Sequence, residues 1–213
     1  MPDHGSVGDR GRHGRPHRPR RARAAPAHEP SRGEPAVSIP APDRTTDPGY
    51  ADWRARVDAV WADDALDERE VMRRIDALAA ERPDDPEALA EAGGARDSAG
   101  LESWAEQLYV RALDGGLGEP FRSQVVIQLA STVRNLGRPE ESIALIDAHY
   151  GDRPDHELAA AASAFRALAL TSAGRQVEAV ADLLLALAPT LPRYQRSVRG
   201  YARELLGDEG EEG

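Results

Sequence analysis

Apolar side chains recur along the chain with the spacing of one helix face. Trp53, Val57, Val60 and Trp61 stand at positions i, i+4, i+7 and i+8. Residues at these offsets lie on one side of an α-helix. The segment that begins near Tyr50 is therefore predicted to form an amphipathic helix, and its core face includes both tryptophans.

The helical period continues through most of the remaining chain. Val71, Ile75 and Leu78 repeat the spacing after the stretch DERE (67–70), which resembles a capping box. Asp85 followed by a proline is typical of another helix start. Later helices are predicted over about 86–99, 101–114, 120–136, 138–151, 154–173, 175–189 and 192–206. No segment shows the alternation of a half-buried strand, so we predict an all-α fold of paired helices.

Residues 137–152 have an outline that returns 37 residues away in both directions. Gly100, Gly137 and Gly174 open the three copies. Each is predicted to end a helix at positive φ, which costs glycine least. A small side chain follows each glycine by five residues and a large apolar one by nine: Ala105 and Tyr109, Ser142 and Ile146, Ala179 and Leu183. Paired helices are expected to approach closely at the small residue, while the large residue packs against the next pair.

The positions before each glycine repeat as well. Leu89, Ala92 and Gly93 have the spacing of Val126, Leu129 and Ala130. The combined pattern resembles the tetratricopeptide repeat, W-x2-L-G-x2-Y followed by A-x3-F and P. An earlier degenerate copy has Val71 and Ile75 at the A-x3-F positions and Pro83 at the closing proline. Its small position lies 34 residues before Ala105, the length expected of that repeat.

The resemblance implies a right-handed solenoid of antiparallel helix pairs. About four repeats would occupy residues 49–206, with a C-terminal capping helix, and the pattern looks like a small bacterial family whose members are thought to dimerise. The sequence departs from the repeat in three ways: its tryptophan is absent from every copy, Arg96 replaces its tyrosine, and His149 replaces a small alanine. Stacked pairs need similar sizes at the contacts, not identical residues.

Composition separates two tails from this domain. Residues 1–48 hold nine arginines, six acids and nine of the 16 prolines, with no aromatic side chain. Such a segment buries too little apolar surface to offset the entropy of ordering, so a disordered basic tail is expected. A true start downstream, for instance at Val37, is an alternative. Residues 207–213 are expected to form an acidic disordered tail.

Several function classes are excluded or disfavoured by residue content. Without cysteine, the chain has no disulfide framework, thiolate zinc site or cysteine nucleophile. Its longest apolar run, 183–188, is far shorter than the roughly 20 residues that span a bilayer. The Arg20–Arg21 pair has no apolar stretch behind it, unlike an export signal. We expect a cytoplasmic protein without a membrane partner.

One loop gathers side chains that bind metals in other proteins. His149, Asp152, Asp155 and His156 lie within the stretch 149–157. Two histidines seven residues apart across a proline are not a recognised ligand spacing, so a capped loop is the favoured interpretation. The GGLG stretch lacks the lysine and strand of a phosphate loop. We therefore expect no metal, no cofactor and no enzymatic activity.

The family resemblance implies a concave groove lined by the first helix of each pair. This geometry assigns to a peptide-binding surface Gln124, Ile127, Gln128, Ser131, Arg134, Asn135, Phe165 and Leu168, with Glu87, Ala90, Glu91, Gly94 and Asp97 from the preceding pair. Polar side chains in one line suit the main chain or terminal carboxylate of an extended peptide, with Arg134 as the charged anchor. A solvated polar face at Glu87 and Asp97, or an ion pair between Asp97 and Arg134, is the alternative.

Helix 175–189 is apolar nearly all the way round, which is typical of burial on more than one side. The last helix can cover one side with Tyr194, Val198, Tyr201 and Leu205. A two-fold interface at Leu184, Leu185 and Leu187 is predicted to cover the rest and to make the protein a homodimer.

The sequence thus predicts a non-enzymatic module that binds a partner protein or peptide and self-associates. The alternative is an accessory protein that contacts nucleic acid through the stretch RGRHGRPHRPRRARA (10–24). No aromatic residue interleaves those arginines, so a stacking platform for single strands is missing. The chain also has no lysine, and this arginine bias points to GC-rich codons as much as to a ligand.

Overall fold

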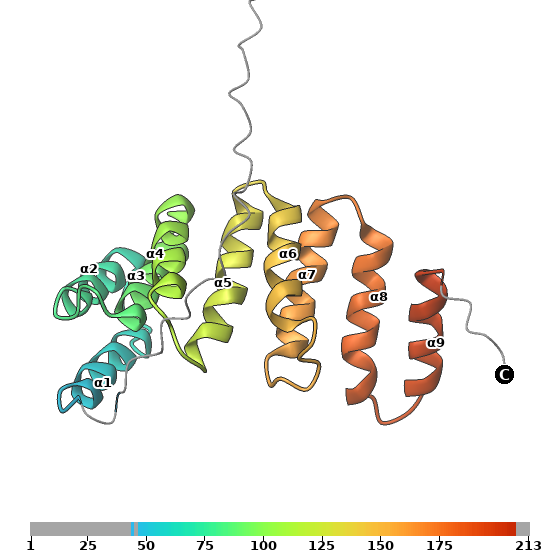
Figure 1. The fold of residues 1–213 in the computed structure, drawn as a ribbon, viewed down its shortest axis with the longest axis horizontal. Coiled ribbons are helices and arrows are strands. Elements are labelled where there is room, and N and C mark those ends of the chain that lie inside the picture. The colour runs from blue at the N-terminus through green and yellow to red at the C-terminus, as the bar shows by residue number, and fades with distance from the viewer. Residues whose placement is uncertain (1–43, 45–46, 208–213) are drawn as a thin grey trace, which may run out of the picture. The chain divides into compact units, whose positions relative to one another are not determined.

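The computed structural model describes Arg44 and residues 47–207, and every regular element in that range is helical (Figure 1). The helices are α1 (Tyr50–Trp61), α2 (Glu68–Ala79), α3 (Pro86–Ser98), α4 (Glu102–Asp114), α5 (Phe121–Asn135), α6 (Pro139–Tyr150), α7 (Ala159–Ser172), α8 (Gln176–Leu187) and α9 (Gln195–Leu205), with a 3₁₀ turn at Ala188–Thr190. The all-α prediction is confirmed for these residues. None of these helices is both long enough and apolar enough to cross a lipid bilayer.

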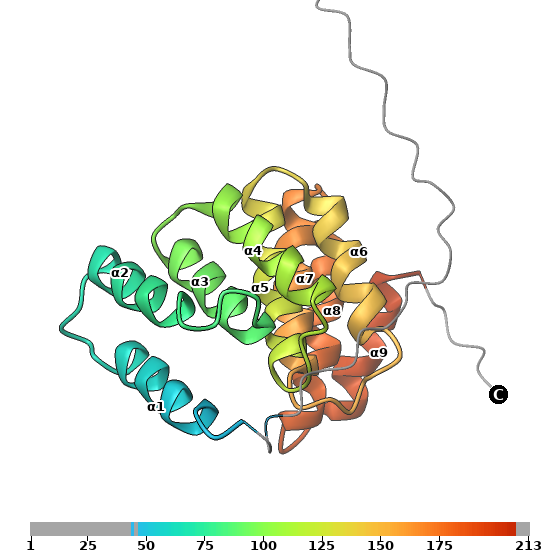
Figure 2. The same cartoon turned by 60° about the vertical axis from the view of Figure 1, so that its left-hand side comes forward.

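Consecutive helices pack against each other along the chain, and α3 and α7 also contact α5 (Figures 1 and 2). The arrangement is a series of antiparallel pairs, α1 with α2, α3 with α4, α5 with α6 and α7 with α8, followed by α9. The first helices of successive pairs therefore lie near one another, which is the condition for a shared binding surface.

The predicted helix starts are largely confirmed. The Asp67 carboxylate accepts a hydrogen bond from the Glu70 N–H at 2.8 Å, and Asp85 accepts one from the Glu87 N–H at 2.9 Å. Each satisfies a backbone donor that the first helical turn leaves unpaired. The capping box at Asp67 is only half formed, because the Glu70 side chain pairs with Arg73 instead.

The repeating glycines end their helices as predicted. Gly100, Gly137 and Gly174 have φ of 70°, 81° and 80°. The next residue's N–H then bonds to the carbonyl five residues back: Leu101 to Arg96, Arg138 to Val133, Arg175 to Leu170. This six-to-one bond is the Schellman motif, which needs a left-handed residue at the helix end. The 37-residue interval is thus marked by the same backbone turn each time.

Two predicted helix boundaries are wrong. The helix expected over 154–173 begins only at Ala159, because residues 151–158 form successive turns that include a bond from the Ala159 N–H to the His156 carbonyl. The helix expected over 192–206 begins at Gln195, because Tyr194 adopts a left-handed conformation with φ of 68°.

The small and the large residue that follow each repeating glycine were predicted to be buried. This is confirmed in the first two copies, and it is wrong for the large residue of the third. Ala105, Ser142 and Ala179 are all buried where paired helices meet, and Tyr109 and Ile146 are buried as well. Leu183 is instead 45% exposed. The prediction that it packs against a following pair is wrong, because no further pair follows α8 in the described residues and α9 leaves Leu183 uncovered.

Part of the predicted basic tail contacts the domain. Arg44 donates to Asp85 at 2.5 Å and to Glu87 at 3.0 Å, and Asp47 accepts from Arg82 at 2.5 Å. Residues 1–43, 45–46 and 208–213 lie outside the described residues, so the disorder expected there stays a prediction.

Candidate functional site

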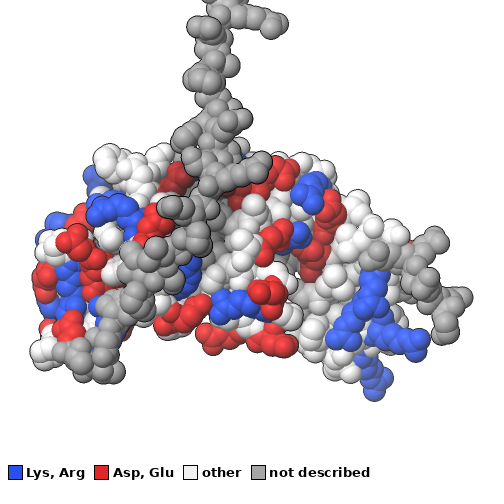
Figure 3. Space-filling view, in the orientation of Figure 1, with Lys and Arg blue, Asp and Glu red and all other residues white. Residues whose placement is uncertain are grey.

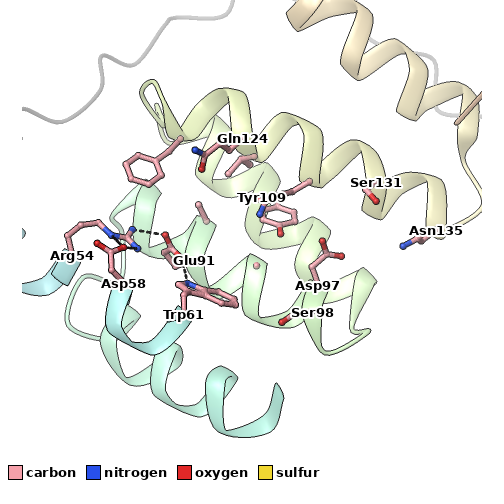
Figure 4. A pocket seen from close by; sticks show the side chains of 15 residues that line it. Arg54, Asp58, Trp61, Glu91, Asp97, Ser98, Tyr109, Gln124, Ser131 and Asn135 are labelled. Carbon is pink, nitrogen blue, oxygen red and sulfur yellow. Dashed lines mark hydrogen bonds and ion pairs between the residues drawn. The ribbon is translucent and has the colours of Figure 1, made fainter. Parts of the chain in front are cut away.

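A groove of about 620 Å³ opens between α1, α3 and α5, the first helices of three successive pairs (Figure 4). Its lining includes Arg54, Asp58 and Trp61 from α1, Glu91, Gly94, Asp97 and Ser98 from α3, and Gln124, Gln128, Ser131 and Asn135 from α5. Ala90 of α3, Tyr109 of α4, and Phe121 and Val125 of α5 complete it.

One wall of the groove is a row of uncharged polar side chains along α5. Gln124, Gln128, Ser131 and Asn135 follow the spacing i, i+4, i+7 and i+11, so they form one line along the helix. The first three side chains make no hydrogen bond within the described part of the chain, whereas the Asn135 Oδ1 accepts one from Arg134 at 2.8 Å. The row therefore presents free donors and acceptors to whatever enters the groove.

The opposite wall is held by an ion pair between α1 and α3. Arg54 donates to Glu91 Oε1 at 2.6 Å and to Asp58 Oδ1 at 2.9 Å, and the Trp61 indole N–H donates to Glu91 Oε2 at 2.6 Å (Figure 4). Burial opposes the charge on Arg54, but the two carboxylates outweigh it and raise its pKa. These contacts make a rigid wall with an exposed indole edge.

The remaining end of the groove contains Asp97 and Tyr109. Asp97 accepts a hydrogen bond from the Thr132 Oγ1 at 3.1 Å, which links α3 to α5. Burial raises the pKa of the Asp97 carboxyl, the nearby Glu102 charge acts in the same direction, and the Thr132 bond opposes them. Tyr109 is fully buried, and its hydroxyl lies beside Asp97, where a weak interaction with the carboxylate also acts to lower the Asp97 pKa, but it forms no hydrogen bond of good geometry with a described residue.

Of the α5 and α7 residues predicted for peptide binding, four line this groove: Gln124, Gln128, Ser131 and Asn135. The α3 residues predicted for the same surface line it as well, except Glu87, which is buried and bonds to Arg44 and Tyr50. Ile127 does not line the groove, because it is buried in the core with Ile146 and Ala162. Phe165 packs against that same cluster, and Leu168 lies exposed on α7 away from the groove.

Arg134 lies beside the groove without lining it. Its only side-chain hydrogen bond in the described residues goes to Asn135, and it forms no ion pair there. Asp97 bonds to Thr132, so the alternative of an Asp97–Arg134 pair is not what the structure contains.

The sequence prediction missed the α1 wall. Trp61 was assigned to the core face because it stands at i+8 from Trp53, yet it is 39% exposed. The repeat itself held the missing signal: Trp61, Ser98 and Asn135 are spaced by 37 residues, and so are Arg54, Glu91 and Gln128. Equivalent positions of successive repeats line the same surface.

The histidine-containing loop is fastened to α5. Ser123 Oγ lies 2.9 Å from His149 Nε2 and 3.2 Å from His156 Nε2, while His156 Nδ1 accepts the Leu158 N–H at 3.0 Å. Burial, and then the Arg153 charge, lower the pKa of His149. Ser123 is fully buried, and no three His, Asp or Glu side chains in the described residues are placed to hold a metal ion. The cluster's evident role is to anchor the 151–158 turns.

A second surface is apolar and lies on α8. Val177, Val180, Leu183 and Leu187 form one stripe, and each is about half exposed. Of the residues predicted for self-association, Leu187 belongs to this stripe, Leu184 is half-buried, and Leu185 lines a separate cavity of about 760 Å³ between α6, α7 and α8.

The last helix covers less of α8 than predicted. It packs through Ala202, which is buried, and this places Val198 at the edge of the contact. Tyr194, Tyr201 and Leu205 remain exposed, so the predicted capping face is wrong for these three. Positive side chains gather over α9 (Figure 3), and none of Arg193, Arg196, Arg199 and Arg203 is in an ion pair with a described residue.

A family model described as tetratrico peptide repeat matches residues 86–205, more than half of the chain. No curated protein and no solved structure matches the chain.

Proposed function

Because the chain belongs to the tetratricopeptide repeat family, whose members are generally modules for protein–protein interaction and typically non-enzymatic scaffolds, we propose that the groove binds an extended segment of a partner protein. The match covers α3 to α9, so two of the three groove helices belong to the matched repeats.

The row on α5 carries this proposal. Side chains four residues apart on a helix are separated by about 6 Å along its axis. This is close to the two-residue repeat of an extended chain, about 6.6 Å. Gln124 and Gln128 can therefore meet successive main-chain groups on the same side of a bound strand. A carboxamide offers both a donor and an acceptor, which suits the N–H and C=O of a peptide backbone.

The neighbouring side chains add to the row. The Asn135 Oδ1 is occupied by Arg134, which leaves its NH2 group to donate into the groove. In this proposal Arg134 acts as an anchor through Asn135, by fixing the orientation of that amide. Trp61 and Phe121 supply apolar surface for one or two ligand side chains. A groove of about 620 Å³ is within the usual range of small binding sites.

We expect that Gln128→Ala weakens binding of a groove peptide by about threefold to tenfold, the net value of one hydrogen bond. Peptides would be selected from a displayed library of random dodecamers with the full chain as bait, and their dissociation constants measured by fluorescence anisotropy. Gln124→Ala should have a similar effect, because the two side chains occupy equivalent places in the row.

Gln107→Ala is the matched control. Gln107 is an exposed glutamine on α4, and its amide already donates to the Ser103 carbonyl. It should leave peptide affinity unchanged, and all three variants should melt within a few degrees of the wild type. Equal affinities for Gln128→Ala and Gln107→Ala would show that the selected peptides bind elsewhere.

We propose further that the α8 stripe joins two copies of the chain. The leucine and valine side chains of the stripe are each about half exposed and lie in a row. Together they form a continuous apolar surface, which is larger than that of an isolated apolar residue. A two-fold contact places such a stripe against its own copy, so both partners gain the same burial. Leu184 and Leu187 lie in or beside this stripe, whereas Leu185 faces the cavity of α6, α7 and α8.

Leu183→Glu is expected to convert the dimer to a monomer, because it places a charge at the centre of the stripe. Light scattering at micromolar concentration should give about twice 23.0 kDa for the wild type and 23.0 kDa for the variant. Leu168→Glu, which is equally exposed but lies on α7, should stay dimeric. A monomeric wild type across that concentration range is the result that rejects this interface.

A further inference from the structure

The groove lining contains more negatively charged than positively charged side chains. Asp58, Glu91 and Asp97 contribute three carboxylates, and Arg54 is the one cation among the lining residues described. Arg54 contacts both Asp58 and Glu91, so those two carboxylates already have a partner. Asp97 has no cation within ion-pair distance in the part of the chain that the structure describes.

The surroundings of Asp97 disfavour a lone charge. It lies half-buried on α3, and its one side-chain hydrogen bond of good geometry comes from the neutral Thr132 hydroxyl. Burial raises the pKa of the carboxyl, and the charge that acts on it in the same direction, that of Glu102, is also negative. A carboxylate in such a place gains more than an exposed one from an approaching positive charge.

A second feature lies at the same end of the groove, beside Asp97. The Tyr109 hydroxyl belongs to a fully buried side chain and lacks a well-formed hydrogen bond, although buried hydroxyls almost always have one. Burial, and then the Asp97 charge beside it, raise the pKa of Tyr109, so the phenol stays protonated and neutral. Its oxygen keeps a lone pair free, but the atom is buried, so a ligand donor can bond to it only after a small shift of the groove side chains around it.

The other groups at this end can accept hydrogen bonds as well. Ser98 and Ser131 stand on either side of Asp97 in the lining, on α3 and α5 (Figure 4). Neither hydroxyl accepts a bond from a described residue, and Ser98 donates to the Ala95 carbonyl, so its lone pairs face no competing donor. A ligand group that carries several N–H donors and a positive charge fits this set, whereas a carboxylate would meet the Asp97 charge.

We propose that the Asp97 end of the groove is a subsite for the cationic side chain of an arginine or lysine in the bound partner segment. The inference rests on the proposed function and adds the chemistry of the partner. The ligand's N–H groups donate to the Asp97 carboxylate and to the Tyr109 oxygen, while the α5 row holds the neighbouring main chain. The partner is therefore a basic segment, not one that ends in the groove with a free carboxylate.

The test uses acetylated, amidated nonapeptide mixtures in which one position at a time is fixed as arginine, lysine, glutamate or norleucine. Norleucine matches the aliphatic stem of lysine without its charge. We expect the full chain to bind the arginine and lysine mixtures at least about tenfold more tightly than the norleucine mixture at one position, the usual scale of a charge-assisted hydrogen bond. Glutamate at that position should bind most weakly.

Asp97→Asn should remove this preference and leave norleucine binding unchanged. The asparagine Oδ1 can still accept the Thr132 bond, and the variant should melt no lower than the wild type, because a buried charge is removed. Asp114→Asn is the control: it removes the charge of an exposed acid on α4 that does not line the groove, so the preference for arginine should persist. For the wild type, the preference should also decline as the pH falls through the Asp97 pKa.

Each outcome bears on the inference. Mixtures that bind through Gln128 but show no difference between arginine and norleucine overturn the subsite and leave the groove function intact. A preference that survives in Asp97→Asn likewise overturns it. If no mixture binds at all, the groove function fails and this inference fails with it.

Discussion

Trp53→Ala is expected to lower the free energy of unfolding by about 3–5 kcal/mol, the usual cost of truncating a buried tryptophan. The side chain is 1% exposed and packs among Val57, Ile75 and Leu78. Its indole N–H donates to the Leu78 carbonyl at 2.9 Å, which is a buried bond between α1 and α2. The variant loses the packing and also leaves that carbonyl without its partner. Urea denaturation followed by circular dichroism at 222 nm measures the difference.

Trp104→Ala is the matched control, since Trp104 is 63% exposed on α4. We expect a change within about 0.5 kcal/mol, as for most surface substitutions. Similar losses for both variants would contradict the assignment of Trp53 to the core. Because α1 supplies Arg54 and Trp61 to the groove, Trp53→Ala should also weaken peptide binding as α1 loosens, which links the core of the first pair to the site.

Local chemistry explains why much of the fold was predictable. A glycine at a helix end, a proline after an aspartate and an apolar side chain every three or four residues act within one turn of backbone. Gly137 and Asp85 behave as predicted for that reason. The 37-residue period then follows from stacking, because each pair needs the same small and large contacts as its neighbours.

The sequence predictions are wrong where a neighbouring element determines whether a side chain is buried or where a helix begins. Periodicity shows which residues of α8 share a face, but not which element covers that face. Leu183 was predicted to be buried by analogy with Tyr109, and it is exposed because α9 packs through Ala202 on a different side. The late start of α7 has a similar cause: residues 151–158 are held by bonds between Ser123 and His156, which are 33 residues apart.

In the candidate site, too, the features set within one helix were predictable and those set by neighbouring helices were not. The row from Gln124 to Asn135 was predictable, because one helix sets its spacing and the family resemblance sets its direction. Which charged side chains of the groove are paired could not be predicted from the sequence. Arg134 was predicted as an anchor unpaired by acids, and it forms no ion pair with a described residue, but it does not line the groove. Whether a groove charge is paired depends on partners a full repeat away. Arg54 meets Glu91 across 37 residues, and no such partner reaches Asp97 among the described residues.

Gly93→Ala and Gly94→Ala are expected to change stability in opposite directions, although the two glycines are adjacent in the middle of α3. In either case alanine favours the helix by about 1 kcal/mol relative to glycine. A Cβ on Gly93 would lie 2.8 Å from Cδ1 and Cε1 of the Tyr109 ring, well inside contact distance. A Cβ on Gly94 would lie 3.6 Å from Trp61 Cζ2, an ordinary contact.

The Tyr109 ring decides the sign at Gly93. It is fully buried between α3 and α4, so it cannot move aside without displacing the residues packed around it. Overpacking of this kind costs about 1–3 kcal/mol or more, which exceeds the helix gain.

We therefore expect Gly93→Ala to lower the free energy of unfolding by about 1–2 kcal/mol and Gly94→Ala to raise it by up to about 1 kcal/mol. Urea denaturation of the two variants side by side measures both, and a Gly93→Ala variant as stable as Gly94→Ala would refute the close approach of α3 and α4. The same shift of the ring moves its hydroxyl relative to Asp97, so Gly93→Ala should also reduce the preference for basic peptides.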